Sequence, residues 1–503
     1  MKFRILLFLF LANMTLAETP KRAMVLVFDQ MRAEYIDRFD MKNFKRAKAL
    51  GVHFENGIVG HLESNTIVSH PVISTGKLPR NLPWGMHVMK DVRGLLGPKN
   101  HFYNPFNFSP EQYRMLHFAI SGDSSLLARM REFYPGKTFA VAQKKYAALN
   151  YGGAYADSII CLDSAFKKGP WKGQHRIGGR AVPDYISQPF GNRFYLAATN
   201  DWGSHDEVYP FKGNSFLTGH DPKRPGGDAW VGDVVEQIMT REPEWSIVLA
   251  SFGSIDKVSH VLAEHDGPSE KDWAIKENIS LREATRKADV ELGRILDRLE
   301  ATGLDKETAL VLTADHGGQH SRFFHGRRTP NAHEDNLWVG LGHTENVPEA
   351  IQPLVDTGLI DVASMNTILS FWTKAMTDVQ TKNFIHLMSQ TAGVAEVYSK
   401  QRQFGKDSYQ LEFQSSKLTG QELRWARTRH PELVDSLASE TGPQFIALLF
   451  DNHGYDVPGS HGGAQELVQR IPFIVISPNL KKKSVSRDWV RLIDVNLILE
   501  RIL

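Results

Sequence analysis

Cysteine is almost absent from this chain, which has Cys161 as its only cysteine among 503 residues. A chain with one thiol forms no internal disulfide, so its stability must come from core packing or from bound metal. Cys161 lies in the apolar-leaning stretch ADSIICLDS, and free cysteine is among the most frequently buried residue types. We therefore predict that Cys161 packs as a small buried apolar side chain.

The sequence also lacks an excess of charge of either sign, with 59 basic and 57 acidic residues. Two of the basic residues, Lys2 and Arg4, lie in a first segment that we expect to be removed, and without them the two signs balance. A surface that binds nucleic acid or membrane through bulk charge is therefore not expected.

A long apolar run is missing as well. Lys2 and Arg4 precede a short apolar stretch that ends in small residues, and this is the three-part layout of a secretory signal. The stretch is shorter than the roughly 20 residues of a membrane-spanning helix, and no later segment qualifies. We expect residues 1–17 to be a signal peptide cleaved after Ala17, and the mature chain, residues 18–503, to be periplasmic or secreted.

What the chain does contain is the alternation of strands and helices typical of an α/β protein. Apolar residues make up 42% of the sequence, enough for a large core, and continuous apolar runs alternate with helical patterns such as residues 281–303. Such runs suit strands that are covered on both faces. The sequence predicts a doubly wound, mostly parallel sheet flanked by helices. The predicted strands are residues 23–29, 137–142, 245–253, 309–315, 444–450 and 471–477.

Two long segments interrupt this alternation. Residues 80–235 are rich in glycine, proline and aromatic residues, and residues 320–440 also break the rhythm. The chain has no internal repeat, low-complexity tract or polar linker. We therefore expect a single domain over residues 18–503, in which these two insertions cover the active edge of the sheet.

Polar residues recur where the strands are predicted to end. In LTADHGG, residues 312–318, Asp315 and His316 directly follow an apolar run. Ligands of open α/β sheets gather outside the carboxyl ends of the strands, although a single polar residue there is ordinarily a turn or cap. The mixture of aspartate and histidine suits zinc or a related transition metal better than calcium or magnesium. The candidate ligands are Asp29, Asp256, His260, Asp315, His316 and His461.

Five short motifs follow one another in the order VLVFDQMR, NTIVSHPVISTGKLP, GSIDKVSH, LTADHGG and GSHGG. Together they resemble the signature of the alkaline phosphatase superfamily, nearest its nucleotide pyrophosphatase/phosphodiesterase branch and its single-chain periplasmic alkaline phosphatase branch. Each motif is short, but the ordered set is specific. It extends from residue 23 to about residue 480, nearly the whole mature chain.

The resemblance implies two divalent metal ions, preferably zinc, and Thr66 as the nucleophile. Two neighbouring cations lower the pKa of a hydroxyl and stabilise the leaving oxygen of an in-line displacement. The implied reaction is attack of Thr66 on phosphorus, followed by hydrolysis of the phosphothreonine. Thr66 is also a good helix N-cap residue, as are Ser64 and Asn65, and the two roles are compatible. By the resemblance, one metal is held by Asp29, Thr66, Asp315 and His316, and the other by Asp256, His260 and His461.

A lysine bears on the class of substrate. Lys144, in AVAQKKYAALNYGG, matches the lysine with which the monoesterase branch contacts a dianionic monoester, although Tyr146 stands where that branch has an arginine. A monoester carries one more negative charge than a diester, so an added cation favours monoesters. The alternative is an exposed lysine beside Lys145.

Two other branches of the superfamily fit less well. Phosphodiesterases usually have an asparagine that contacts a phosphoryl oxygen, but His87 occupies the counted position, and Asn81, His87 and Lys90 remain open as replacements. Sulfatases need a cysteine or serine followed by an arginine in the motif Cys/Ser-x-Pro-x-Arg, because their nucleophile is made from that residue. In SHPVI, residues 69–73, Ile73 stands where that arginine would be. The nearby residues His70, Lys77 and Arg80 are expected to be solvated loop residues.

More than one histidine could be the last metal ligand. We prefer His461 because the stretch after it, ELVQRIPFIVISPNLK, also resembles the family, and His325 is the second choice. His320, His333 and His453 lack that context.

The sequence therefore predicts an exported two-metal hydrolase of small phosphate esters, with phosphomonoesters slightly favoured. A phosphodiesterase or nucleotide pyrophosphatase and a non-catalytic ligand-binding member are the alternatives. A mutase or transferase is disfavoured by the signal peptide, because phospho-sugar metabolism is largely intracellular. The expected partner is a small-molecule phosphate ester, with no membrane span after signal removal, and the oligomeric state is left open.

Overall fold

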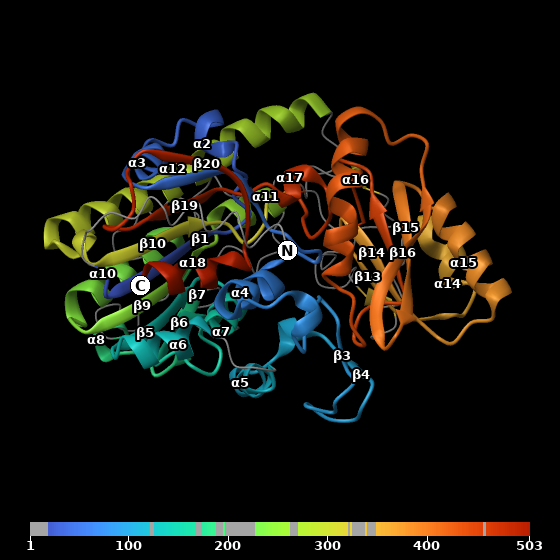
Figure 1. Ribbon diagram of the computed structural model, residues 1–503, viewed down its shortest axis with the longest axis horizontal. Coiled ribbons are helices and arrows are strands. Elements are labelled where there is room, and N and C mark those ends of the chain that lie inside the picture. The colour runs from blue at the N-terminus through green and yellow to red at the C-terminus, as the bar shows by residue number, and fades with distance from the viewer. Residues whose placement is uncertain are drawn as a thin grey trace.

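The two largest β-sheets in the described part of the chain lie side by side in the computed structural model of the protein (Figure 1). The predicted signal peptide lies outside the described residues. Among the residues that the structure describes, no helix combines the length and the apolar character that crossing a membrane requires. The described residues are 19–120, 125–165, 174–187, 195–196, 227–261, 270–319, 322–323, 338–339, 349–455 and 459–503.

Within the described residues, the larger sheet has ten strands, of which only β7 (Gln174–Arg180) and β19 (Phe473–Ile476) run against the others. Its central strands are almost wholly buried, as expected for continuous apolar runs covered on both faces. Cys161, on β6, is fully buried, as predicted. The spatial order is β20 (Ser484–Arg491), β2 (Val52–Ile58), β19 (Phe473–Ile476), β10 (Thr308–Thr313), β1 (Arg22–Phe28), β9 (Trp245–Phe252), β5 (Lys137–Ala142), β6 (Ser158–Ala165), β7 (Gln174–Arg180) and β8 (Tyr195–Leu196).

Helices cover this sheet in two groups, one on each face (Figure 1). One group contains α3 (Lys42–Leu50), α10 (Gly227–Arg241) and α12 (Glu270–Thr302), and the other contains α4 (Thr66–Thr75), α7 (Lys145–Gly152) and α18 (Asp494–Ile502). This arrangement confirms the predicted doubly wound α/β class. Helix α12 begins earlier than expected and ends before Gly303, whose φ of 72° suits a glycine after a helix.

The smaller sheet has six antiparallel strands in the part of the chain that the structure describes, and it has its own apolar clusters on both faces. It includes the buried segment expected at residues 444–450, which therefore joins this second sheet and not the larger one. An apolar run shows that a strand is buried, but it does not show which sheet the strand joins. The order is β12 (Trp338–Val339), β13 (Ile360–Met365), β14 (Ile368–Thr373), β17 (Phe445–Leu449), β15 (Val394–Gln403) and β16 (Lys406–Gln414), with α15 (Asp378–Gln390) and α16 (Gly420–Asp435) packed nearby.

The central strands of the larger sheet end at one level. β10, β1, β9 and β5 are consecutive neighbours and run parallel. Val27 pairs with Thr313, and Phe28 pairs with Phe252, so the residues that follow these strands emerge side by side. The sheet register therefore places the polar residues after four different strands at a single edge.

Candidate metal centre

The carboxyl edge of the larger sheet gathers polar residues from separate parts of the chain. Asp29 follows β1, and Asp315 and His316 follow β10. Asp256 lies in the first turn of α11 (Ser254–Val261), the helix that follows β9. All four side chains are buried.

Thr66 is the first residue of α4, which starts at the same edge. The helix is capped by Asn65, whose Oδ1 accepts a hydrogen bond from Val68 N at 3.1 Å. Because Asn65 provides the cap, the Thr66 hydroxyl is available for the site, where its Oγ1 donates to Asp29 Oδ2 at 3.3 Å. The positive end of the helix dipole at this point favours bound anions.

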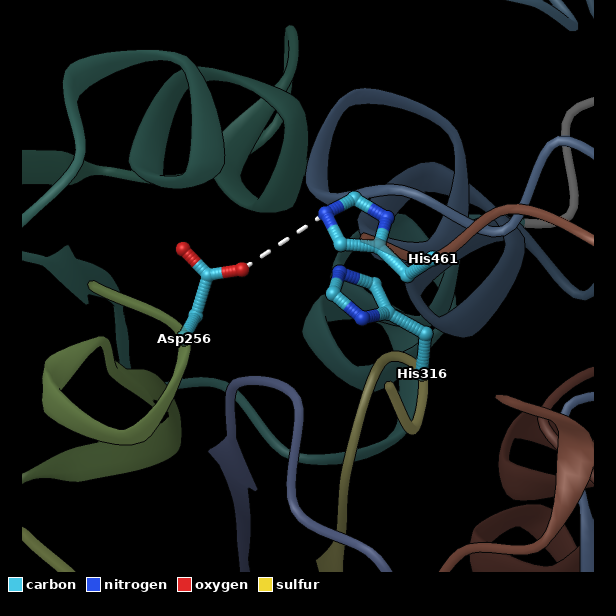
Figure 2. A group of neighbouring side chains, drawn as sticks. All are labelled: Asp256, His316 and His461. Atoms are coloured by element: carbon cyan, nitrogen blue, oxygen red, sulfur yellow. Dashed lines mark ion pairs between the residues drawn. The ribbon is translucent and has the colours of Figure 1, made fainter. Parts of the chain in front are cut away.

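Two groups of potential metal ligands share His316. Asp29, Asp315 and His316 each offer a ligand atom within 4.8 Å of the others, and so do Asp256, His316 and His461. Figure 2 shows the second group, in which the His316 and His461 rings stack with centroids 3.7 Å apart. His461 Nε2 lies 3.6 Å from Asp256 Oδ1. The structure thus brings the side chains of Asp29, Asp315 and His316 together and places those of Asp256 and His461 beside His316. The side chain of His260 lies outside the described residues.

The chemistry of these atoms fits divalent cations. Asp29 Oδ1, Asp315 Oδ2 and His316 Nε2 are shielded from solvent and make no hydrogen bond to any of the described residues. Such atoms are costly to bury unless a partner binds them. Burial raises the pKa of Asp29 well above its usual value, as do the negative charges of Asp256 and Asp315, whereas Lys144 lowers it. Cations at this position would remove that repulsion.

The histidine rings are oriented for metal binding. Nδ1 of His316 lies 3.1 Å from the carbonyl oxygen of Gly317, and Nδ1 of His461 lies 3.1 Å from that of Ser64. These hydrogen bonds place the proton on Nδ1 and leave Nε2 as the ligand atom. Burial lowers the pKa of His316, which keeps its ring neutral, as metal binding requires.

The other histidine candidates are placed differently. The backbone of His260 lies in α11, but its side chain lies outside the described residues, as do His320, His325 and His333 entirely. His453, in β18 (His453–Gly454), is described, and its Nδ1 bonds to the carbonyl oxygen of Asp451 at 2.8 Å.

Lys144 is buried at the centre of the site and is not an exposed lysine. Its Nζ lies 2.5 Å from Asp29 Oδ2, 2.7 Å from Asp256 Oδ2 and 3.0 Å from Thr66 Oγ1. Burial alone would lower the pKa of Lys144, but Asp256 and Asp29 raise it well above its usual value. The ammonium group therefore stays charged beside the Thr66 hydroxyl.

With this geometry in view, comparison with known sequences identifies the family. The family model described as type I phosphodiesterase / nucleotide pyrophosphatase matches residues 23–82 and 133–336, more than half of the chain. The chain belongs to this family. The matched ranges include Asp29, Thr66, Lys144, Asp256, Asp315 and His316, whereas His461 lies outside them. No curated protein sequence matches the chain significantly.

Solved structures share the fold across nearly the whole chain. Wild-type alkaline phosphatase PafA is 14% identical, with a TM-score of 0.62 over 97% of this chain and 96% of that chain. Human ectonucleotide pyrophosphatase / phosphodiesterase 5 is 12% identical, with a TM-score of 0.52 over 96% and 94%. An inactive variant of the murine protein in complex with AMP is 12% identical, with a TM-score of 0.50 over 96% and 95%. These likenesses and the family match confirm the predicted resemblance to the alkaline phosphatase superfamily.

One member of the site was missed by the sequence analysis. His70 is fully buried in α4, so the expectation of a solvated loop residue was wrong. Its Nδ1 lies 2.8 Å from the carbonyl oxygen of Thr66, and its Nε2 lies 3.0 Å from Ser251 Oγ. Burial lowers its pKa to about 4, so the ring is neutral near pH 7. The signal that His70 lies in a buried helix was the stretch TIVSHPVIST, in which His70 is the only residue with an ionisable side chain.

The family's missing asparagine has no simple replacement among the three candidates. Asn81 is exposed, and Lys90 places its Nζ 5.8 Å from the centroid of the Phe102 ring. His87 is buried, but its Nδ1 lies 3.1 Å from Glu63 Oε2. This nitrogen of His87 is therefore engaged by a carboxylate.

Proposed function

We propose that this chain is an exported phosphate-ester hydrolase that uses Thr66 as its nucleophile and two divalent metal ions, preferably zinc, with phosphomonoesters favoured over diesters. Family membership supports phosphoester hydrolysis, and the names of the structural neighbours span alkaline phosphatase and nucleotide pyrophosphatase/phosphodiesterase. Export rests on the layout of residues 1–17. The expected substrate is a small phosphate ester.

The contact between Lys144 and Thr66 is the observation that carries the monoester preference. The ammonium lies 3.0 Å from the hydroxyl oxygen that would attack phosphorus. A phosphoryl group attacked by Thr66 would have its non-bridging oxygens within reach of Lys144. A monoester presents a dianion there and a diester a monoanion, so the fixed cation favours the monoester.

The remaining residues have separate tasks in this proposal. Bound metal ions would activate the hydroxyl and stabilise the leaving oxygen. Asp29, Asp315 and His316, with Thr66 as the fourth expected ligand, would hold one ion. Asp256 and His461, with His260 as the third expected ligand, would hold the other. Asp29 also accepts the hydrogen bond that orients Thr66, and the start of α4 faces the incoming negative charge.

A comparison of an aryl phosphate monoester with the matching diester tests the substrate class. In zinc-loaded wild-type protein we expect the monoester to react with the higher kcat/KM. Lys144→Ala is expected to lower kcat/KM for the monoester by roughly 100-fold and for the diester by less than about tenfold, because the lost charge interacts more strongly with the dianion. Lys145→Ala, at the adjacent half-buried position, is the matched control and should leave the ratio unchanged.

Two results would contradict the substrate assignment. A wild-type protein that prefers the diester would be a phosphodiesterase. Equal losses for both substrates in Lys144→Ala would show that the lysine does not discriminate between them.

A further inference from the structure

A buried glutamate lies three residues before the proposed nucleophile. The Glu63 side chain has no solvent exposure, and its φ of 52° is uncommon for a residue with a side chain. Its Oε1 accepts a hydrogen bond from Ser370 Oγ at 3.2 Å. Its Oε2 accepts one from Asn366 Nδ2 at 3.4 Å and lies 3.1 Å from His87 Nδ1. Both carboxylate oxygens are thus engaged by polar groups from distant parts of the chain.

These contacts come from the smaller sheet and from the loop before β3 (Met89–Asp91). Ser370 lies on β14, and Asn366 lies in the turn that joins β13 to β14. Asn366 Oδ1 also accepts from Ile368 N at 2.7 Å, which fixes the orientation of its amide. The His87 ring stacks on Phe106, with centroids 5.6 Å apart. Glu63 therefore connects the second sheet to the segment that leads into α4.

On its other side, the same segment holds two residues of the site. The Glu63 carbonyl oxygen accepts from Asn65 Nδ2 at 2.8 Å, and Asn65 caps the helix that begins at Thr66. The carbonyl oxygen of the next residue, Ser64, orients the His461 ring, and Ser64 N bonds to the Gly462 carbonyl oxygen at 3.4 Å. The stretch from Glu63 to Thr66 is thus bonded both to the proposed nucleophile's helix and to a proposed metal ligand.

We propose that Glu63 is a positioning residue that fixes Thr66 and His461 relative to each other by anchoring their shared segment to the smaller sheet. The inference rests on the proposed function for the roles of Thr66 and His461. A residue held at positive φ persists only where its surroundings determine the conformation, and the three contacts of Glu63 supply that constraint. Without the carboxylate, the donors of Asn366 and Ser370 lose their acceptor inside the protein.

The chain offers a matched control for Glu63. Glu396, on β15, is equally buried, and its Oε2 lies 2.7 Å from His430 Nδ1 and accepts from Tyr398 at 2.9 Å. It has the same kind of glutamate–histidine pair as Glu63, but none of its described contacts reaches α4 or His461. Glu63→Gln and Glu396→Gln both keep the size of the side chain and remove one buried carboxylate.

The experiment measures Tm, kcat, KM and the affinities of the two zinc ions by chelator competition in both variants of the full chain. We expect both to lower Tm. Glu63→Gln alone should lower kcat by roughly tenfold while KM stays nearly unchanged. It should also lower the affinity for one of the two zinc ions by roughly tenfold, as is typical when a group that orients metal ligands is lost. Ser370→Ala, which removes one contact only, should give a smaller loss of the same kind.

Zinc affinity is measured without substrate, so it separates this inference from the proposed function. If wild type hydrolyses no phosphate ester but Glu63→Gln alone weakens one zinc ion, the positioning role stands and the proposed activity fails. If Glu63→Gln matches Glu396→Gln in kcat and in both zinc affinities, or if wild type binds no zinc, the positioning role is overturned.

Discussion

Thr66→Ala is expected to lower kcat for an aryl phosphate monoester by on the order of 1,000-fold or more, because it removes the only proposed atom that attacks phosphorus. The substitution removes the hydroxyl whose oxygen lies 3.3 Å from Asp29 Oδ2 and 3.0 Å from Lys144 Nζ. The helix should remain, because its cap is provided by Asn65. Steady-state kinetics of zinc-loaded protein measures the effect.

Two variants of α4 serve as controls for that result. Thr66→Ser keeps a hydroxyl at the same position and should retain much of the activity. Thr75→Ala removes a buried threonine hydroxyl from the other end of the helix, where it bonds to the Pro71 carbonyl oxygen, and should leave kcat within about twofold, since it lies outside the site. Hydrolysis by Thr66→Ala at a rate within tenfold of wild type would exclude Thr66 as the nucleophile.

Removal of divalent metal should abolish hydrolysis and lower Tm. Without cations, the carboxylates of Asp29, Asp256 and Asp315 are buried together, and the ammonium group of Lys144 contacts those of Asp29 and Asp256. A ligand that binds only the folded state stabilises it by about 4 kcal/mol when its free concentration is about 1,000 times its Kd. Thermal unfolding with zinc and with a chelator measures this difference.

His316 provides the control for metal removal, because it belongs to both ligand groups. His316→Ala should bind less zinc and should show a much smaller Tm difference between zinc and chelator than wild type. Re-addition of zinc to metal-free wild-type protein should restore its activity. Unchanged Tm and activity in wild-type protein from which elemental analysis shows all metal to be gone would contradict the metal centre.

Much of the larger sheet could be predicted, because buried parallel strands appear in the sequence as apolar runs that end in polar residues. β1, β5, β9 and β10 are short apolar runs, and the polar residues that follow them stand out because a buried strand does not tolerate them. Parallel strands that are neighbours in a sheet end at the same edge. The assembly of Asp29, Asp256 and Asp315 follows from that rule together with the family resemblance.

The features of the fold and the site that the sequence did not predict depend on contacts between segments far apart in the chain. The continuous apolar run over residues 444–450 predicts a buried strand, but which sheet it joins depends on the pairing of β17 with β14 and β15. Lys144 and Lys145 are adjacent and chemically alike, and only the direction of the chain at the start of α7 buries the first among the carboxylates. Glu63 could not be singled out from the sequence, because its contacts with Asn366 and Ser370 join residues more than 300 positions apart.

A phosphorylated Thr66 is the most direct test of the central claim that this threonine attacks phosphorus. Zinc-loaded protein would be mixed with an aryl phosphate monoester, quenched in acid within one turnover, digested and mapped by mass spectrometry. The account predicts a phosphate on Thr66 in wild type, which is absent from Thr66→Ala treated in the same way. Hydrolysis of the ester with no phosphorylated residue, or with the phosphate on another side chain, would contradict the account.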